Sequence, residues 1–194
     1  MPDVEASFHI DQPASRVWDF FQDVPEVVTC MPGTELLSQE GEATYAGRVT
    51  VKLGPVTAAF EGEATIVETD RSARTATIEA TGVDRRGSNR ATARMAYEIQ
   101  EHDGGARVRL HGTVKLSGAL AQMGRGGIVQ DVASHLTAQF SSRLHEKLAR
   151  HGQEGDVDAD AQAPPGAIAG TRVARIVALS WIRRMLASLL GRGG

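Results

Sequence analysis

The sequence has few cysteines, few aromatic residues and no long run of apolar residues. Its 194 residues include a single cysteine, Cys30, which excludes an internal disulfide and a cysteine-based zinc site. A lone thiol is typical of a reducing compartment. The first residues, Met-Pro-Asp-Val-Glu, lack the basic and apolar regions of a signal peptide. We therefore expect a protein that works on the cytoplasmic side.

Charge is unevenly distributed along the chain, although the formal net charge is only −3. Residues 152–170 carry four acidic residues and no basic one, whereas residues 171–194 carry five arginines and no acidic residue. The part before them is slightly acidic and lacks the basic stripe that nucleic-acid binding requires. The distribution argues against a nucleic-acid partner. It predicts a folded domain over 1–150, a flexible acidic linker over 151–170 and a basic tail over 171–194.

Period-two alternation dominates the predicted domain. It predicts antiparallel strands over 4–10, 45–53, 56–66, 76–80, 91–99 and 108–116. A helix is expected to begin at Asp11 or Pro13, and a second short helix to end near Cys30. Residues 119–150 change to helical spacing, with the regular part starting around Gly127. The pattern predicts an α+β fold, in which a curved antiparallel sheet of six to seven strands wraps on a long C-terminal helix.

The inward face of this predicted sheet carries many small residues: Ala58, Gly62, Ala64, Ala80, Ala91, Ala93 and Gly112. Because protein interiors are closely packed, such a face needs large partners from the helices or a bound guest. Filling by Trp18, Phe20, Met123 and Phe140 is one alternative, and an apolar cavity is the one we favour. Strand parity and helical spacing predict these ligand-binding residues: Phe20, Tyr45, Val49, Val51, Phe60, Ile66, Ala80, Met95, Tyr97, Leu110, Val114, Leu120, Met123, Ile128, Val132, Leu136 and Phe140.

Few residues suggest catalysis. Cys30 has no histidine near it in sequence and is better explained as a small apolar residue at a turn. Asp131 and His135 lie on one helix face, where half-buried or surface pairing is a better explanation than acid–base chemistry. Gly124–Gly127 could hold a phosphate, but no phosphate-binding pattern surrounds it, so a hinge or a plain helix start is the better explanation. The Tyr45 hydroxyl could bind a ligand carbonyl or a main-chain group. The histidines lack metal-binding spacing, so we predict neither an enzyme nor a metal site.

The segment 171–194 has the pattern of an amphipathic helix that lies on a membrane. Placing each arginine at the centre of a bilayer would cost roughly 2.5–3.5 kcal/mol, so a membrane-spanning position is unfavourable. At the surface of an anionic membrane, each arginine instead contributes about 1 kcal/mol to binding. Docking onto a protein is the alternative. The predicted membrane-binding residues are Arg172, Arg175, Trp181, Ile182, Arg183, Arg184, Met185, Leu186, Leu189 and Leu190. We expect peripheral attachment to the cytoplasmic face of the cell membrane.

Several short motifs resemble one protein family when taken in order. They are Pro13-Ala14-Ser15-Arg16-Val17-Trp18, Cys30-Met31-Pro32-Gly33, Gly54-Pro55-Val56, Phe60-Glu61-Gly62 and Ser117-Gly118-Ala119-Leu120-Ala121-Gln122-Met123-Gly124. Together they resemble the G-subunit family of carbon monoxide dehydrogenase, within the START-like helix-grip superfamily, over about residues 3–148. The segment Thr81–Ser88 departs from the glycine-rich pair of strands expected there, because it carries two arginines and an aspartate.

The resemblance implies a helix-grip domain with an apolar cavity and a molybdenum-containing carbon monoxide dehydrogenase as partner. It further implies attachment of that enzyme to the membrane and a link to the respiratory quinone pool. We therefore expect a carrier whose tail holds it at the membrane and whose cavity takes up a quinone, menaquinone, for the dehydrogenase. Two alternatives stay open. The first is an anchoring adaptor without a ligand, and the second is a START-like enzyme of the cyclase or hydrolase type, which needs a polar cluster in the cavity.

Overall fold

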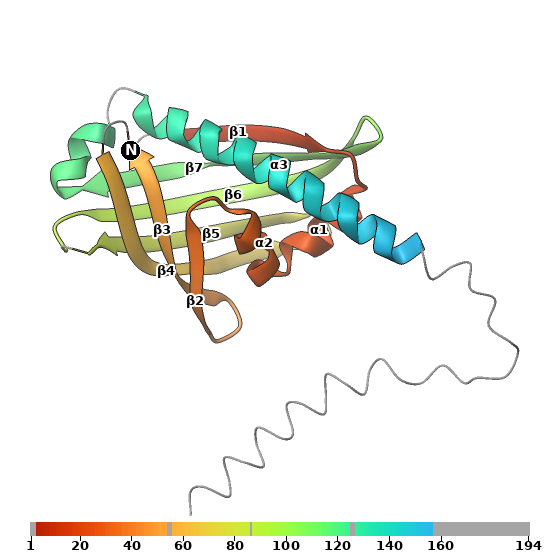
Figure 1. The fold of residues 1–194 in the computed structure, drawn as a ribbon, viewed down its shortest axis with the longest axis horizontal. Helices are drawn as coiled ribbons and strands as arrows, with labels where there is room; N and C mark the ends of the chain where they lie inside the picture. Colours follow the sequence, from red (N-terminus) through yellow and green to blue (C-terminus); the bar gives the residue numbers. More distant parts are fainter. Residues whose placement is uncertain (1–2, 54–55, 86, 125–126, 157–194) are drawn as a thin grey trace, which may run out of the picture. The chain divides into compact units, whose positions relative to one another are not determined.

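The strands and helices follow one another in the order that the sequence pattern suggests. A computed structural model describes residues 3–53, 56–85, 87–124 and 127–156 (Figure 1). The elements are β1 (Asp3–Ile10), α1 (Ala14–Phe21), α2 (Val24–Cys30), β2 (Thr34–Glu40), β3 (Thr44–Leu53), β4 (Val56–Asp70), β5 (Thr75–Asp84), β6 (Arg90–His102), β7 (Gly105–Ser117), the 3₁₀ helix η1 (Gly118–Gly124) and α3 (Ile128–Asp156). The predicted tail over 171–194 lies outside the described residues.

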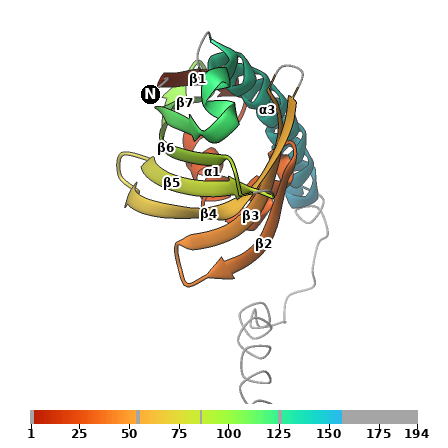
Figure 2. The same cartoon turned by 90° about the vertical axis from the view of Figure 1, so that its left-hand side faces the viewer.

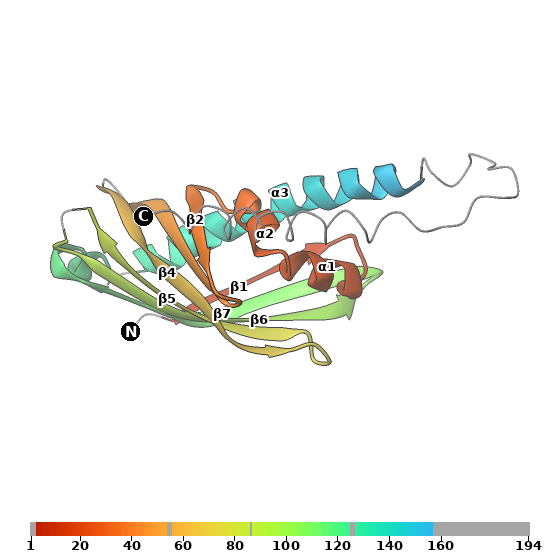
Figure 3. The same ribbon diagram turned by 90° about the horizontal axis from the view of Figure 1, so that it is seen from below.

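All seven strands form one antiparallel sheet in the order β1-β7-β6-β5-β4-β3-β2. Hairpins join β2 through β7 in sequence, and β1 closes the other side by pairing with β7. The sheet is strongly curved, and α1, α2 and α3 lie on its concave side (Figures 2 and 3). This arrangement confirms the predicted α+β fold with a long C-terminal helix.

The sequence pattern missed the edge strand β2. Its residues, Thr-Glu-Leu-Leu-Ser-Gln-Glu, are mostly exposed and do not alternate, because an edge strand beside solvent needs few inward apolar side chains. The helix α3 also continues to Asp156, six residues past the predicted end at 150. The polar and small residues from His151 onward suggested a linker because they offer little to bury. A glycine among them costs only about 1 kcal/mol within a helix and does not stop it.

The curvature of the sheet depends on close backbone approach at two glycines. A Cβ on Gly62 in β4 would lie 2.0 Å from the carbonyl oxygen of Thr81 in β5, and a Cβ on Gly112 in β7 would lie 2.1 Å from that of Arg94 in β6. Real Cβ atoms do not approach backbone so closely, so only glycine permits these bends. A register shift between Ile66 and Glu68 adds a further bend to the 15-residue strand β4.

The two short helices α1 and α2 lie on the concave face together with α3 (Figure 3). Helix α1 follows Pro13 and buries Ala14, Val17, Trp18 and Phe21 against the sheet. The first turn of α2 contains a proline, and its N-cap Asp23 accepts a hydrogen bond from the Glu26 amide.

Within the described part of the chain, no helix has both the length and the apolarity that crossing a membrane requires.

Polar contacts fix α3 to the rest of the domain near both of its ends. Gln130 Nε2 donates to the Glu5 carbonyl oxygen at 2.8 Å, close to the start of the helix. Near the other end, His145 Nε2 lies 3.1 Å from a carboxylate oxygen of Asp11. Arg16 Nη2 donates to the carbonyl oxygen of Leu148 at 3.1 Å. The long helix is therefore held across the sheet at separate points.

We expect Gly62→Ala to lower the free energy of unfolding by about 1–3 kcal/mol, because β4 and β5 must move apart to admit the methyl group. Urea denaturation followed by circular dichroism measures this loss. Gly41→Asn is the matched control: Gly41 has φ +79° with no atom within 4 Å of a Cβ, and asparagine tolerates that conformation. Equal losses for the two variants would contradict the role given to the close approach.

Candidate ligand-binding site

Inward side chains form straight rows across the sheet, because residues opposite each other in antiparallel strands share a face. One row crosses five strands through Tyr45, Ala64, Ala80, Ala93 and Val114. Neighbouring strands lie about 4.8 Å apart, so three adjacent alanines leave a wide stretch of the face with only methyl groups.

The next row toward η1 is smaller still, since it runs through Gly47, Gly62, Gly82, Ala91 and Leu116. The row on the other side is larger and contains Ile66, Ile78 and Met95. The middle of the concave face therefore carries little side-chain volume, and larger side chains lie beside it.

Two buried clusters close the ends of the concave face. The α1 cluster comprises Ile10, Ala14, Val17, Trp18, Phe21, Ala76, Tyr97, Ile99, Ala106, Val108, Leu144 and Leu148. It is packed as a true core, since Ile99 is 1% exposed and Val108 is 0% exposed. The η1 cluster comprises Ala58, Phe60 and Leu120. These clusters supply the buried apolar packing that holds the helices on the sheet.

A further set of half-buried residues, which we call the middle band, belongs to neither cluster. It comprises Tyr45, Val49, Ala64, Ala80, Ala93, Met95 and Val114 from the sheet and Leu136 from α3. Every member is half-buried, although the sheet residues among them face the side that carries the helices. Solvent therefore reaches apolar side chains on the inner face, where a hydrophobic molecule would bury them.

The structure divides the predicted lining residues into three groups. Phe20, Ile66, Tyr97, Leu110 and Phe140 lie in or against the α1 cluster, and Val51, Phe60, Leu120, Ile128 and Val132 lie in or against the η1 cluster. Tyr45, Val49, Ala80, Met95, Val114 and Leu136 lie in the middle band. The side chain of Met123 lies outside the described part of the structure.

Ala64 and Ala93 belong to the middle band but were not among the predicted lining residues. Strand parity had already placed both on the inward face of the sheet. Alanine is a weak signal for a site, because the same residue occurs wherever a sheet packs closely. Their position in one row with Tyr45 depends on strand register, which a single sequence does not supply.

Tyr45 supplies a polar group at one end of the alanine row. Its hydroxyl oxygen lies 3.5 Å from Nε2 of Gln39, which is opposite it on β2, a long distance for a hydrogen bond. Gln39 is the donor in this contact, so the hydroxyl proton can be donated to a carbonyl oxygen in the band. Tyr45 can therefore orient a ligand that carries a carbonyl group.

Tyr97 has a different environment, within the α1 cluster. Its ring lies against Phe21, with centroids 5.0 Å apart, and against Trp18 at 6.1 Å. Burial raises the pKa of the Tyr97 hydroxyl above the ordinary value of 10.0, and a hydrogen bond with Gln22 opposes this only in part. We assign Tyr97 to the core of the domain.

The other candidate residues occupy structural positions. Cys30 is 1% exposed at the end of α2. Asp131 and His135 are both exposed, and His135 Nε2 lies 2.6 Å from the side-chain nitrogen of Gln139. Gly127 has φ +81°, and its carbonyl oxygen accepts the Asp131 amide in the first turn of α3. Within the ranges that the structure describes, no three histidine, cysteine or acidic side chains are arranged to hold a metal ion.

Comparison with known families identifies the chain. Residues 6–149 match the sequence profile of CoxG, the family of the G subunit of carbon monoxide dehydrogenase. The chain belongs to this family. The match confirms the resemblance inferred from the sequence motifs, and it gives the protein an accessory role associated with carbon monoxide dehydrogenase. A search of curated proteins finds no sequence match.

Solved structures share the fold of this CoxG family member at low sequence identity. A conserved protein from Geobacillus kaustophilus is 15% identical with a TM-score of 0.67, covering 77% of this chain and 96% of its own. A protein from Mycobacterium smegmatis is 17% identical with a TM-score of 0.54, covering 77% and 92%. The Zhui aromatase/cyclase from Streptomyces sp. R1128 is 14% identical with a TM-score of 0.54, covering 78% and 95%. At these identities the likeness shows the helix-grip fold alone.

Alkaline titration should report the buried position of the Tyr97 hydroxyl. The folded state keeps the Tyr97 proton at a pH where the unfolded state has released it, so this stabilisation is present below about pH 10 and is lost as pH rises through the raised pKa. We expect Tyr97→Phe to remove the tyrosinate absorbance that this hydroxyl develops above about pH 10 and to reduce the loss of stability in the same range. Tyr45→Phe is the control and should keep the absorbance step that Tyr97→Phe removes; loss of that step in the control would contradict the assignment.

Proposed function

We propose that this chain is a membrane-tethered carrier for a hydrophobic respiratory quinone, with menaquinone as its cargo. In this function it links a molybdenum-containing carbon monoxide dehydrogenase to the quinone pool of the membrane. The observation that carries the proposal is the middle band, which combines small side chains with half-buried apolar ones on the face that the helices cover. The family assignment supports the choice of enzyme partner.

The chemistry of the band suits a quinone. Its sheet residues are apolar apart from Tyr45, whose hydroxyl can donate to a quinone carbonyl. The isoprenoid chain would cover Ala80, Ala93 and Met95, and each CH₂ removed from water contributes about 0.8 kcal/mol. A polar contact at one end and an apolar floor along the rest match a molecule with a polar head and a long tail.

Tethering by the segment 171–194 rests on its sequence alone. The five arginines and the apolar stripe that includes Trp181, Leu186 and Leu190 suit the surface of an anionic bilayer. This proposal locates the protein at the cytoplasmic face of the cell membrane. A peripheral helix suits a carrier, because it holds the domain near the quinone pool without burying it in lipid.

A carrier needs no catalytic group, and we propose that the chain is not an enzyme. The anchoring adaptor remains the competing function, since it shares the tail and the enzyme partner but makes no use of the middle band. Enlarging an inward residue distinguishes the two functions, because only the carrier depends on free volume above the alanine row.

The cargo can be tested with one inward and one outward substitution on the same strand. Organic extracts of full-length protein, purified from menaquinone-rich membranes, should contain about one quinone per chain by mass spectrometry. Ala93→Phe should lower this content at least about tenfold, because the ring fills the middle of the row. Ala96→Phe lies opposite Thr77 and His111 on the outer face and should keep the content. An empty wild-type protein that still supports the dehydrogenase would favour the adaptor.

Deletion of residues 171–194 tests the tether. The shortened protein should no longer float with vesicles that contain anionic lipid, while its circular dichroism should keep the signal of the folded domain. Reversal of binding by salt is expected for the full chain, because arginines supply part of the attraction. Undiminished flotation after the deletion would show that another part of the chain holds the membrane.

A further inference from the structure

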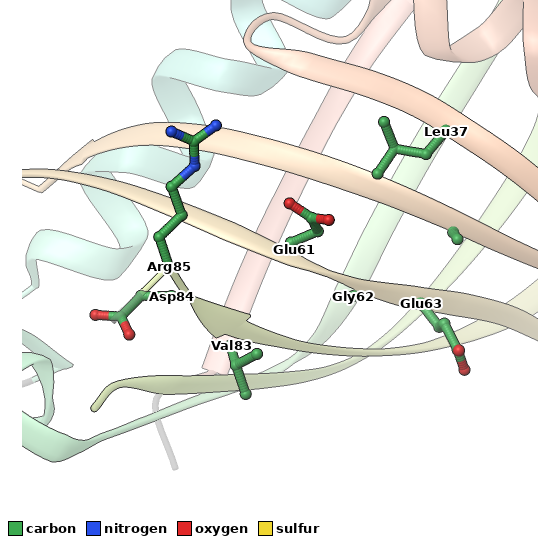
Figure 4. Close-up of a pocket in the computed structure, with 8 residues that line it drawn as sticks. Leu37, Glu61, Gly62, Glu63, Val83, Asp84 and Arg85 are labelled. Atoms are coloured by element: carbon green, nitrogen blue, oxygen red, sulfur yellow. The ribbon is translucent and has the colours of Figure 1, made fainter. Parts of the chain in front are cut away.

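The outer, convex face of the sheet has a hollow of about 480 Å³ between the β2 edge and the end of β5 (Figure 4). Leu37, Ala46 and Val83 form its apolar part, and Glu61, Glu63 and Arg85 are charged residues on its lining. We propose that this hollow is the docking site for the dehydrogenase, a proposal that rests on the function proposed above. The dehydrogenase would insert a lysine or arginine that is flanked by apolar side chains.

A bulge in the edge strand exposes Leu37 at this position. The pairing of β2 with β3 shifts between Leu36 and Ser38, so Leu37 has no partner residue in the ladder. Bulges of this kind re-aim a side chain, and here the leucine is 47% exposed beside the hollow. Val83 on β5 is 36% exposed and lines the same hollow. Two of the exposed large apolar side chains thus lie on one small site, as expected for a protein interface.

The charged residues of the hollow favour a basic side chain on the partner. Arg48 Nη2 lies 3.1 Å from Glu61, and Arg48 Nη1 lies 2.9 Å from Glu35, so the Glu61 carboxylate is held by a guanidinium that it shares with Glu35. Glu63 lies opposite Ala46 on β3 and Thr81 on β5, neither of which is a cation. The carboxylate of Glu63 therefore attracts a basic side chain to the apolar part of the hollow.

The same charges favour a protein over a membrane. Among the described residues, the lining carries the carboxylates of Glu61, Glu63 and Asp84 and the guanidinium of Arg85. The neighbouring Arg48 is shared between Glu61 and Glu35, so the described charges around the hollow remain negative in sum. An anionic lipid surface would be repelled by this excess of negative charge, whereas a basic patch on a protein would be attracted. The hollow is therefore unsuited to the lipid contact that we propose for the segment 171–194.

Docking at the hollow leaves the concave face free. On β4, Glu61 and Glu63 point outward while Gly62 and Ala64 belong to the inward rows, so one strand separates the hollow from the middle band. A loaded carrier can therefore bind the enzyme without losing contact with its cargo.

The hollow is also linked to η1 by hydrogen bonds. Asp84 accepts the Ser88 amide at 2.9 Å, and Asn89 Oδ1 accepts the Leu120 amide at 3.0 Å.

The test measures binding of the full-length protein to the purified holoenzyme of carbon monoxide dehydrogenase by biolayer interferometry. We expect Leu37→Ser and Glu63→Lys each to weaken binding about tenfold, since one removes the apolar contact and the other repels the basic partner. Val67→Ser and Glu68→Lys are matched controls, because Val67 is 45% exposed and both residues lie on β4 away from the hollow. Both controls should bind within about twofold of the wild type.

The outcomes separate docking from carriage, provided that the quinone content of each variant is measured in parallel. Equal binding by the hollow variants and the controls would overturn the docking site, and so would a wild-type protein that does not bind the enzyme at all. Weakened binding by the hollow variants with normal quinone content supports it. If the wild type carries no quinone but the hollow variants still bind more weakly than the controls, the docking site stands and the carrier function fails. Circular dichroism of each variant confirms that the fold is retained.

Discussion

Strands β4 and β5 approach each other so closely at Gly62 that no side chain fits between them. The missing side chain lets the two backbones come together, and the sheet bends there instead of continuing flat. Gly112 permits a second bend between β6 and β7. A sheet bent at two places has a deep concave side, and a single helix crossing it is held at separate points rather than along its whole length.

The uneven core follows from this geometry. Near α1 the large residues Trp18, Phe21 and Tyr97 fill the space between helix and sheet. Near η1 the smaller group around Phe60 and Leu120 closes the opposite end. Apart from these clusters the concave face offers mostly methyl groups, and the apolar side chains of the middle band stay half-buried. We regard these half-buried side chains as the physical basis of the proposed cargo site, since an apolar guest would bury them further.

Side chains alternate along each strand, so the two faces of the sheet have different properties. On β4 the inward Gly62 and Ala64 shape the concave side, while the outward Glu61 and Glu63 give the convex side its charge. Substitutions on one face can therefore change one property and spare the other. The carrier function that we propose requires this separation, because cargo and partner would have to be bound at the same time.

Local alternation and short motifs were enough to predict the family, the α+β class, the long closing helix and the inward parity of each long strand, because a single chain displays them directly. The edge strand β2 and the bulge that exposes Leu37 could not be predicted, because neither has an apolar period. Which inward residues share a row, and which are buried in a core, depends on how the strands pair in three dimensions. Tyr45, Ala64, Ala80 and Ala93 lie far apart in sequence, and only the pairing of β3 through β6 brings them together.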